Sequence, residues 1–279
     1  MERATQDHSL PYLGFGLRLR REYLQAVLSE RPDVDWFELI SESYMEQPEE
    51  ELQKLDSIRT DYPLVMHGIS LAIGSPWPLD REYLARIKGM VERFQPEWVS
   101  DHLCWSGADD LQGQMLPLPY STDMLEHLVP RVREVQDYLG MQILLENVPA
   151  DQAGPGPLEI PEAEFIAEVA ERTDSLILVD VENLHTSSVN WDFSPNEYLE
   201  KLPESRIKQL HLLGATALCE PGQESPSAPD PVWELYLQAL DRFGPITTMV
   251  DRVDTIPSLQ EMVNELAKAR CGSKRYLTT

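Results

Sequence analysis

The chain has 279 residues, of which 42% are hydrophobic, so it is long enough to bury a large core within one domain. Asp and Glu number 48 against 23 Lys and Arg, which gives a formal net charge of -25. A charge of this sign repels phosphate backbones and anionic membrane surfaces, so we expect no nucleic acid and no membrane among the partners.

The cysteines and the first residues indicate a reduced, intracellular setting. Cys104, Cys219 and Cys271 are too few and too scattered for a disulfide framework or for a metal knuckle built on paired cysteines. The opening residues MERATQDHSLPYLG contain no apolar stretch of signal-peptide length, and no apolar run is long enough to span a bilayer. We therefore expect a cytoplasmic protein.

Short apolar runs rich in β-forming residues recur along the whole chain. Several are apolar at consecutive positions, which is typical of parallel strands that are buried on both faces. The predicted strands are 12–19, 34–40, 63–69, 98–105, 141–148, 175–184, 207–214 and 246–253.

Helices are expected between these strands, and several have a recognisable start. Asp80 precedes the stretch 81–94, whose apolar residues recur at helical spacing. Ser121 or Thr122 can cap the next helix, and Gly140 can end it in a left-handed conformation. Further helices are predicted at 162–173, 231–243 and 258–270.

Eight strands that each precede a helix, within about 250 residues, predict a single (β/α)8 TIM barrel of the α/β class. A doubly wound open sheet would bring a Gly-rich phosphate loop after the first strand, but Gly14 and Gly16 lead to Leu-Arg-Leu-Arg. We expect one domain over 1–279, with an N-terminal tail at 1–11 and a C-terminal tail at 272–279. The Pro/Gly-rich stretches 149–160 and 215–231 are interpreted as long loops on the active-site face.

Residues that bind hard or borderline cations stand near the carboxyl ends of most predicted strands. Closing the barrel brings these strand ends onto one ring, which is where TIM barrels carry their reacting groups. The candidates in chain order are Glu38, Glu42, His67, Asp101, His102, Glu146, Asn147, Asp180, Glu182, Asn183, His211 and Asp251.

Each of these residues also has a purely structural interpretation. A single histidine near a strand end is more often a hydrogen-bonded core residue, and a single buried carboxylate more often pairs with Arg or caps a helix. Repetition at one barrel level changes this balance, because several carboxylates that converge without Lys or Arg require compensating cations. His and carboxylate ligands without thiolates suit iron, manganese or zinc, and their number allows two metals.

The same segments resemble a known family, the MbnB-like multinuclear non-haem iron oxidases of the methanobactin-biosynthesis type, formerly a family of unknown function. The resemblance covers nearly the whole chain, and the ordered set is specific although no single piece is. It is carried by GFGLR (14–18), DWFELISESYM (35–45), HGISLAIGS (67–75), SDHLCWSG (100–107), LPLPYS (116–121), LLENV (144–148), LVDVEN (178–183), HLLG (211–214), DPVWELY (230–236) and DRVDTIP (251–257).

The resemblance implies a TIM barrel that holds iron and uses molecular oxygen to modify cysteine residues of a ribosomally made precursor peptide. A small partner protein would present the peptide. Carried over by position, one iron would be held by His67, His102 and Glu146. Glu146 would also bridge to a second iron held by Asp180, His211 and Asp251. Further accessory candidates are Asn183, Glu224, Asp101 and Glu42, and we assign no catalytic residue beyond the ligands.

The chain departs from the family pattern where a third metal would be held. The family has Glu where Asp251 stands, a second His where Ala215 stands, and an Asp-Thr-His-Gly segment where residues 222–225 read Gly-Gln-Glu-Ser. Glu224 is the only replacement that this segment offers, so the sequence predicts two irons per chain rather than three. Manganese or zinc would also suit the ligand set.

Two other functions remain open at this point. A divalent-metal isomerase or a phosphodiesterase would use a similar ring of ligands. The net charge disfavours a nucleic-acid substrate, and we expect no catalytic lysine for an isomerase from the strands. A catalytically degenerate barrel that binds a peptide or partner would follow from the losses at 215–225. The leading hypothesis is the oxygen-dependent di-iron oxidase.

Overall fold

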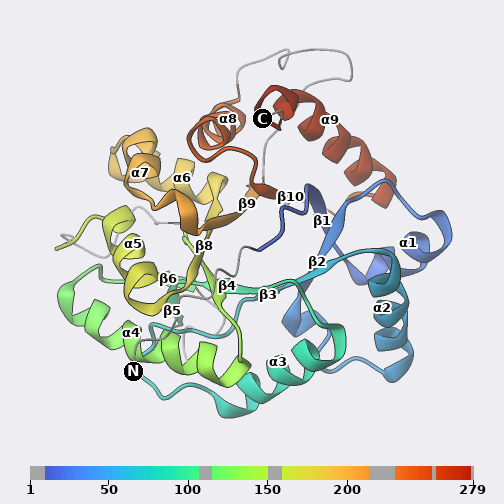
Figure 1. Ribbon diagram of the computed structural model, residues 1–279, viewed down its shortest axis with the longest axis horizontal. Helices are drawn as coiled ribbons and strands as arrows, with labels where there is room; N and C mark the ends of the chain where they lie inside the picture. The colour runs from blue at the N-terminus through green and yellow to red at the C-terminus, as the bar shows by residue number, and fades with distance from the viewer. Residues whose placement is uncertain (1–9, 107–114, 150–158, 214–229, 253–255, 278–279) are drawn as a thin grey trace.

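The computed structural model of the protein describes residues 10–106, 115–149, 159–213, 230–252 and 256–277. Its centre is a closed barrel of eight parallel strands, in the spatial order β1-β10-β9-β8-β7-β4-β3-β2. Helices surround this barrel on its outside (Figure 1). The predicted TIM barrel is therefore confirmed.

The barrel strands fall within the predicted runs but are shorter, because only part of each run is hydrogen-bonded to the neighbouring strands. They are β1 (Phe15–Arg18), β2 (Trp36–Ile40), β3 (Leu64–Gly68), β4 (Val99–His102), β7 (Ile143–Glu146), β8 (Leu176–Asp180), β9 (Ile207–Leu213) and β10 (Thr247–Asp251).

The end of β8 differs from the prediction. The strand was expected to run to residue 184, but it stops at Asp180, whose carboxylate accepts a hydrogen bond of 2.8 Å from the backbone N–H of Asn183. This contact caps α6 (Val181–Trp191), so the chain turns from strand directly into helix. A candidate metal ligand is thereby also the N-cap of a helix.

The predicted caps of three other helices are present. The carboxylate of Asp80 accepts from two backbone N–H groups, and Ser121 and Asp230 each accept from one. Gly140 ends its helix with φ of 80°, the left-handed conformation expected of it. The α-helices other than α6 are α1 (Leu24–Glu30), α2 (Glu49–Asp61), α3 (Arg81–Phe94), α4 (Thr122–Leu139), α5 (Glu162–Thr173), α7 (Pro195–Lys201), α8 (Pro231–Phe243) and α9 (Leu259–Leu277), and Asp80, Ser121 and Asp230 cap α3, α4 and α8.

The predicted C-terminal tail is wrong in its extent, because α9 continues through Leu277. Ser273 is fully buried, and its hydroxyl donates a hydrogen bond of 2.6 Å to the carbonyl of Ala269. Tyr276 and Leu277 pack against the core, so this stretch has an apolar face that keeps it helical. Within the described residues no helix is long and apolar enough to cross a membrane.

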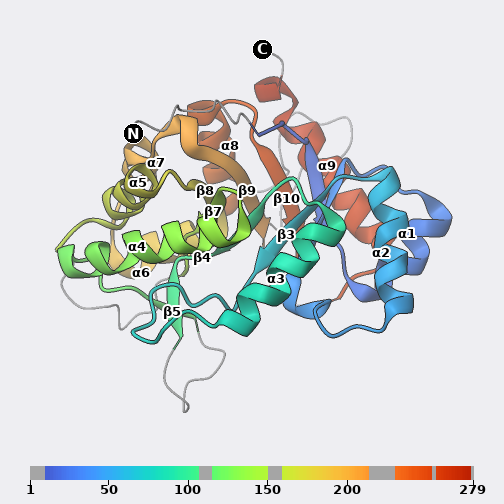
Figure 2. The same ribbon diagram turned by 60° about the horizontal axis from the view of Figure 1, so that its bottom comes forward.

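A small two-stranded sheet was not predicted. The run 98–105 divides into β4 and β5 (Cys104–Ser106), and β5 pairs antiparallel with β6 (Met115–Pro117). Figure 2 shows β5 beyond the end of β4, at the edge of the barrel. Most of the two predicted active-site loops, 149–160 and 215–231, and most of the N-terminal tail lie outside the described residues.

The barrel interior is arranged in layers that follow from the two-residue period of strands. An inner apolar cluster lies within the ring, and it comprises Trp36, Val65, Trp98, Leu144, Leu176, Leu178 and Met249, all buried. Five of these residues are each followed, two positions later, by a candidate ligand. Those candidates are Glu38, His67, Glu146, Asp180 and Asp251, which therefore share the inward face near the carboxyl ends of the strands.

Gly16 makes room for this inner cluster. A Cβ atom placed on Gly16 would meet the ring of Trp36, whereas one placed on Gly89 in α3 has nothing within 4 Å. We expect Gly16→Ala to lower the free energy of unfolding by about 1–3 kcal/mol through overpacking. Gly89→Ala should raise it by about 0.5–1 kcal/mol, because alanine favours helix. Urea unfolding followed by circular dichroism measures both, and equal shifts would contradict the packing of Trp36 against β1.

Candidate metal centre

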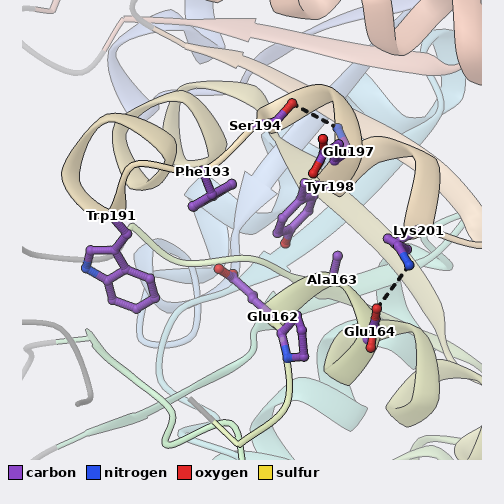
Figure 3. Close-up of a pocket in the computed structure, with 10 residues that line it drawn as sticks. Glu162, Ala163, Glu164, Trp191, Phe193, Ser194, Glu197, Tyr198 and Lys201 are labelled. Atoms are coloured by element: carbon purple, nitrogen blue, oxygen red, sulfur yellow. Dashed lines mark hydrogen bonds and ion pairs between the residues drawn. The ribbon is translucent and has the colours of Figure 1, made fainter. Parts of the chain in front are cut away.

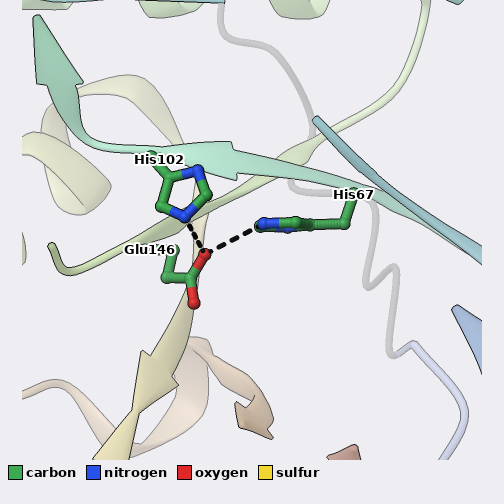
Figure 4. A group of neighbouring side chains, drawn as sticks. All are labelled: His67, His102 and Glu146. Carbon is green, nitrogen blue, oxygen red and sulfur yellow. Dashed lines mark ion pairs between the residues drawn. The ribbon is translucent and has the colours of Figure 1, made fainter. Parts of the chain in front are cut away.

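The carboxylate of Glu146 lies at the centre of the candidate site. Its Oε2 atom is 3.2 Å from Nε2 of His67 and 3.1 Å from Nε2 of His102. Figure 4 shows both imidazole rings directed at this one oxygen. The rings come from the ends of β3 and β4, and Glu146 ends β7, so three neighbouring strands supply the group.

The other oxygen of Glu146 faces a second group. Its Oε1 atom is 2.9 Å from Nδ1 of His211, and the same nitrogen is 4.0 Å from Oδ2 of Asp180. The ligand atoms within each group lie within 4.8 Å of one another, so each group could hold a metal ion. Glu146 belongs to both groups, one carboxylate oxygen to each.

The burial of these side chains gives a test of whether a metal fits. His67, Glu146, Asp180 and His211 are each at most 2% exposed. Glu146 Oε2 is buried without a hydrogen-bond partner, although two histidine nitrogens face it. Buried polar atoms in this state are costly, and a cation between the three groups would satisfy them. Nitrogen and oxygen donors without thiolate suit iron, manganese or zinc.

Several neighbouring side chains orient the candidate ligands. Nδ1 of His67 lies 2.8 Å from the Ser100 hydroxyl. On the other side of the site, Nε2 of His211 lies 3.0 Å from Glu38, which also accepts a hydrogen bond of 2.6 Å from Gln209. Ser100 and Gln209 each precede a predicted histidine ligand by two residues. The period of a strand would therefore have placed them on the same face.

A pair of asparagines holds the backbone around Asp180. The Asn147 amide accepts a hydrogen bond from the N–H of Asp180 at 2.8 Å and donates one to its carbonyl at 3.1 Å. The Asn183 amide in turn donates to the carbonyl of Asn147 at 3.1 Å. The accessory candidate Asn183 thus serves as a brace between the ends of β7 and β8.

The surroundings of two histidines in the site shift their pKa values in opposite directions, downward for His67 and upward for His211. Burial lowers the pKa of His67 to about 3, so this ring is neutral at neutral pH. Burial also acts to lower the pKa of His211, but the carboxylates of Glu38 and Glu146 flank the ring and raise its pKa well above the usual value. In return, and against the effect of burial, His211 holds the pKa of Glu38 at about 2. Burial and then the charge of Glu146 raise the pKa of Asp180 to about 7.

These pKa directions favour a positively charged His211 between the two carboxylates. An imidazolium between two carboxylates satisfies both, as a cation would. A metal at Nδ1 of His211 would have to replace the proton there, because a ligating histidine nitrogen must be free of its proton.

Two accessory candidates, Asp101 and Glu42, lie away from both groups. The Tyr83 hydroxyl is 2.7 Å from Glu42 and 3.3 Å from Asp101, and Glu42 also accepts from the backbone N–H of Ile69. Asp101 points to the face opposite His102, because successive strand residues alternate. These two carboxylates therefore hold α3 and the β3–α3 connection in place.

Asp251 is the one predicted ligand that the structure does not bring to the groups. Its carboxylate pairs with Arg18 at 3.1 Å and with Arg20 at 2.8 Å, and Arg20 also donates to the carbonyl of Arg252 at 2.7 Å. The expectation that the strand-end carboxylates converge without arginine was therefore wrong at Asp251. Because two guanidinium groups neutralise this carboxylate, it requires no metal for compensation.

Two further predictions concern Glu224 and the lysines of the strands. Glu224 lies outside the described residues. No catalytic lysine was expected from the strands, and the one lysine in the barrel strands that the structure describes is Lys208 in β9. Lys208 precedes the inward-facing Gln209, so alternation places it on the opposite face of the strand.

Comparison with known families gives one match that spans most of the chain. A family model described as "RiPP precursor modification enzyme MbnB/TglH/ChrH" matches residues 14–273. RiPP denotes a ribosomally synthesised and post-translationally modified peptide. A UPF0276 protein of Anaeromyxobacter sp. is 43% identical over 263 residues, which cover 92% of each chain. A UPF0276 protein of Caulobacter vibrioides is 39% identical and covers 93% of this chain and 94% of its own.

Solved structures with a similar fold are distant in sequence. D-psicose 3-epimerase from Clostridium cellulolyticum has a TM-score of 0.60 at 14% identity, covering 95% of this chain and 100% of the epimerase. Endonuclease IV from Thermus thermophilus has a TM-score of 0.58 at 15% identity, covering 94% of this chain and 99% of the endonuclease. At such identities the likeness shows the TIM-barrel fold alone.

The partner of His211 makes the site testable by a matched pair of variants. Glu38→Gln removes the carboxylate behind His211, and we expect it to weaken metal binding by about 10- to 100-fold, as loss of such partners does. Glu42→Gln alters a half-buried carboxylate just beyond the end of the same strand and should leave the affinity unchanged. Anaerobic titration with Fe(II) against a chelating dye measures both. An equal loss in the two variants would show that Glu38 has no special role.

Proposed function

Because the chain belongs to the MbnB/TglH/ChrH family of RiPP precursor modification enzymes, we propose that it is an iron- and oxygen-dependent oxidase of peptide cysteine. The family resemblance inferred from the sequence is confirmed by the match over residues 14–273. The closed barrel and two groups of residues that could each hold a metal ion support a metalloenzyme. We further propose that the metal is iron, that each chain holds two irons and that the substrate is a peptide cysteine.

The observation that carries the proposal is the shared carboxylate of Glu146. One metal would be held by His67, His102 and Glu146, and a second by Glu146, Asp180 and His211. A carboxylate whose two oxygens face two separate groups is the arrangement of a bridged two-metal site. Two irons rather than three are also consistent with Asn183, whose amide is used in bracing Asn147.

Iron bound in these groups would supply redox chemistry with molecular oxygen and a Lewis-acid site for a cysteine thiolate. Other residues of the chain orient the ligands and enclose the site. Ser100 fixes the ring orientation of His67, and Glu38 and Gln209 do the same for His211. The inner cluster around Trp36 and Trp98 closes the barrel below the site. We therefore expect a substrate to approach from the carboxyl ends of the strands.

The description of the family supports a peptide substrate. The proposed substrate is a ribosomally made precursor peptide, and a small partner protein is proposed to present it. A manganese or zinc enzyme with isomerase or phosphodiesterase activity remains the alternative use of the same ligand set, together with a barrel that binds a peptide without reaction. The similar epimerase and endonuclease structures give no argument for either, because they show the fold alone.

Metal content per chain tests the proposal. Protein produced in iron-supplemented cells should contain about two irons per chain. Glu146→Ala should lose most of both, because its carboxylate serves both groups. Asp251→Asn should keep its iron, because Asp251 pairs with arginines instead. Elemental analysis of the three proteins measures this, with circular dichroism to verify folding.

Activity is tested on the same preparations. The iron-loaded protein should consume oxygen and change the mass of a cysteine-containing precursor peptide, and the serine version of that peptide should remain unmodified. Zinc as the only bound metal, with oxygen-independent turnover of a sugar or phosphodiester, would move the assignment to the alternative. Absence of any metal from correctly folded protein would leave a binding protein.

A further inference from the structure

A cavity of about 380 Å³ opens between the start of α5, the end of α6 and the helix α7. Figure 3 shows its aromatic and carboxylate side chains around one space. The proposed ligand groups of the metal centre do not contribute to it. Its lining includes Trp191, Phe193, Tyr198, Glu162, Glu164 and Lys201.

The two carboxylates in this lining differ in their partners. Glu164 pairs with Lys201 at 3.1 Å and is therefore neutralised. Glu162 is only 6% exposed, and the side chains of Tyr120 and Tyr198 lie beside it. Among the described residues no Lys, Arg or His pairs with Glu162. Burial accordingly raises its pKa to about 7, although both tyrosines act to lower it.

A cation would therefore complete the environment of Glu162. The cavity offers this carboxylate beside aromatic rings, and Phe193 stacks on Tyr198 with centroids 6.0 Å apart. Aromatic faces and a carboxylate together recognise a guanidinium, which is planar, stacks on rings and pairs with carboxylates. The net charge of -25 adds a long-range attraction for basic segments.

We propose that this cavity binds an arginine side chain of the peptide substrate, and so acts as a recognition pocket separate from the metal centre. The inference rests on the proposed function for its link to a peptide. Because the pocket exists in the chain itself, arginine binding can be tested without any reaction at the metal centre.

Helix α6 connects the candidate metal centre to the pocket, and its length gives an approximate separation. Helix α6 begins directly after Asp180 and ends at Trp191, which lines the cavity. At about 1.5 Å per residue, this helix spans about 15 Å. An extended peptide covers about 3.3–3.6 Å per residue. We therefore expect the arginine roughly four or five residues from the reacting cysteine.

The first experiment uses N-acetyl-arginine amide as the probe and N-acetyl-citrulline amide, its uncharged analogue, as the comparison. Calorimetry should show binding of the arginine compound at least about tenfold tighter than that of citrulline, because citrulline lacks the charge that pairs with Glu162. N-acetyl-lysine amide shows whether the guanidinium itself is required. Weaker binding of lysine than of arginine is expected, and equal binding would overturn the choice of arginine.

Variants locate the site. Glu162→Gln should weaken arginine binding about tenfold or more. Trp191→Leu, which changes the cavity without altering a buried charge, should weaken it as well. Glu168→Gln is the matched control, because this exposed carboxylate is on the same helix and does not line the cavity, and the variant should bind arginine as the wild type does. Unchanged binding in both Glu162→Gln and Trp191→Leu would overturn the proposal.

Peptides connect the pocket to the reaction. Synthetic peptides with one cysteine and one arginine, separated by two to eight residues, should bind most tightly at a separation of four or five. Glu162→Gln should abolish this preference while keeping the wild-type iron content. Iron and oxygen reactivity without any arginine preference would refute the pocket and leave the proposed function intact. Arginine binding in a protein without iron would refute the oxidase and leave the pocket.

Discussion

The carboxylate of Glu146 is the contact on which the arrangement of the barrel mouth depends. Its two oxygens face histidines from three other strands, with His67 and His102 at one oxygen and His211 at the other. A single buried carboxylate could not sustain this position alone, because its charge would be uncompensated. Burial acts to lower the pKa of His211, but Glu38 and Glu146 raise it well above its usual value, so a protonated His211 ring can compensate this charge. Two metal ions would compensate the same negative charge.

The rest of the structure keeps this carboxylate and its neighbours in place. The inner apolar cluster fills the barrel below, and a chain of hydrogen bonds leads upward from it. Trp98 donates to Gln209 at 2.7 Å, Gln209 donates to Glu38, and Glu38 lies against His211. Each link sits on the inward face of its strand, so the closed parallel barrel aligns them without any loop. Precise positioning of ligands by rigid strands and their outer partners is what metal sites require.

Much of this could be predicted from the sequence, and the failures have physical reasons. Strands buried on both faces read as apolar runs, so all eight were found, and the convergence of most candidate ligands at their ends followed from the barrel. The partner of Asp251 was missed because Arg20 stands 231 positions away in the chain and meets it only when β1 and β10 close the barrel. The end of β8 was missed because the apolar run in the sequence continues past Asp180. Its role as the cap of α6 is visible only in the structure. The extended α9 was missed because its last turns bury small and polar residues such as Ser273.

The central claim is that Glu146 bridges two irons, and anomalous diffraction at the iron edge tests it most directly. Crystals of the iron-loaded protein should show two iron positions on opposite sides of the Glu146 carboxylate. One should lie beside His67 and His102, and the other beside Asp180 and His211. A single iron position, or an iron coordinated by Asp251 in place of Glu146, would contradict the account.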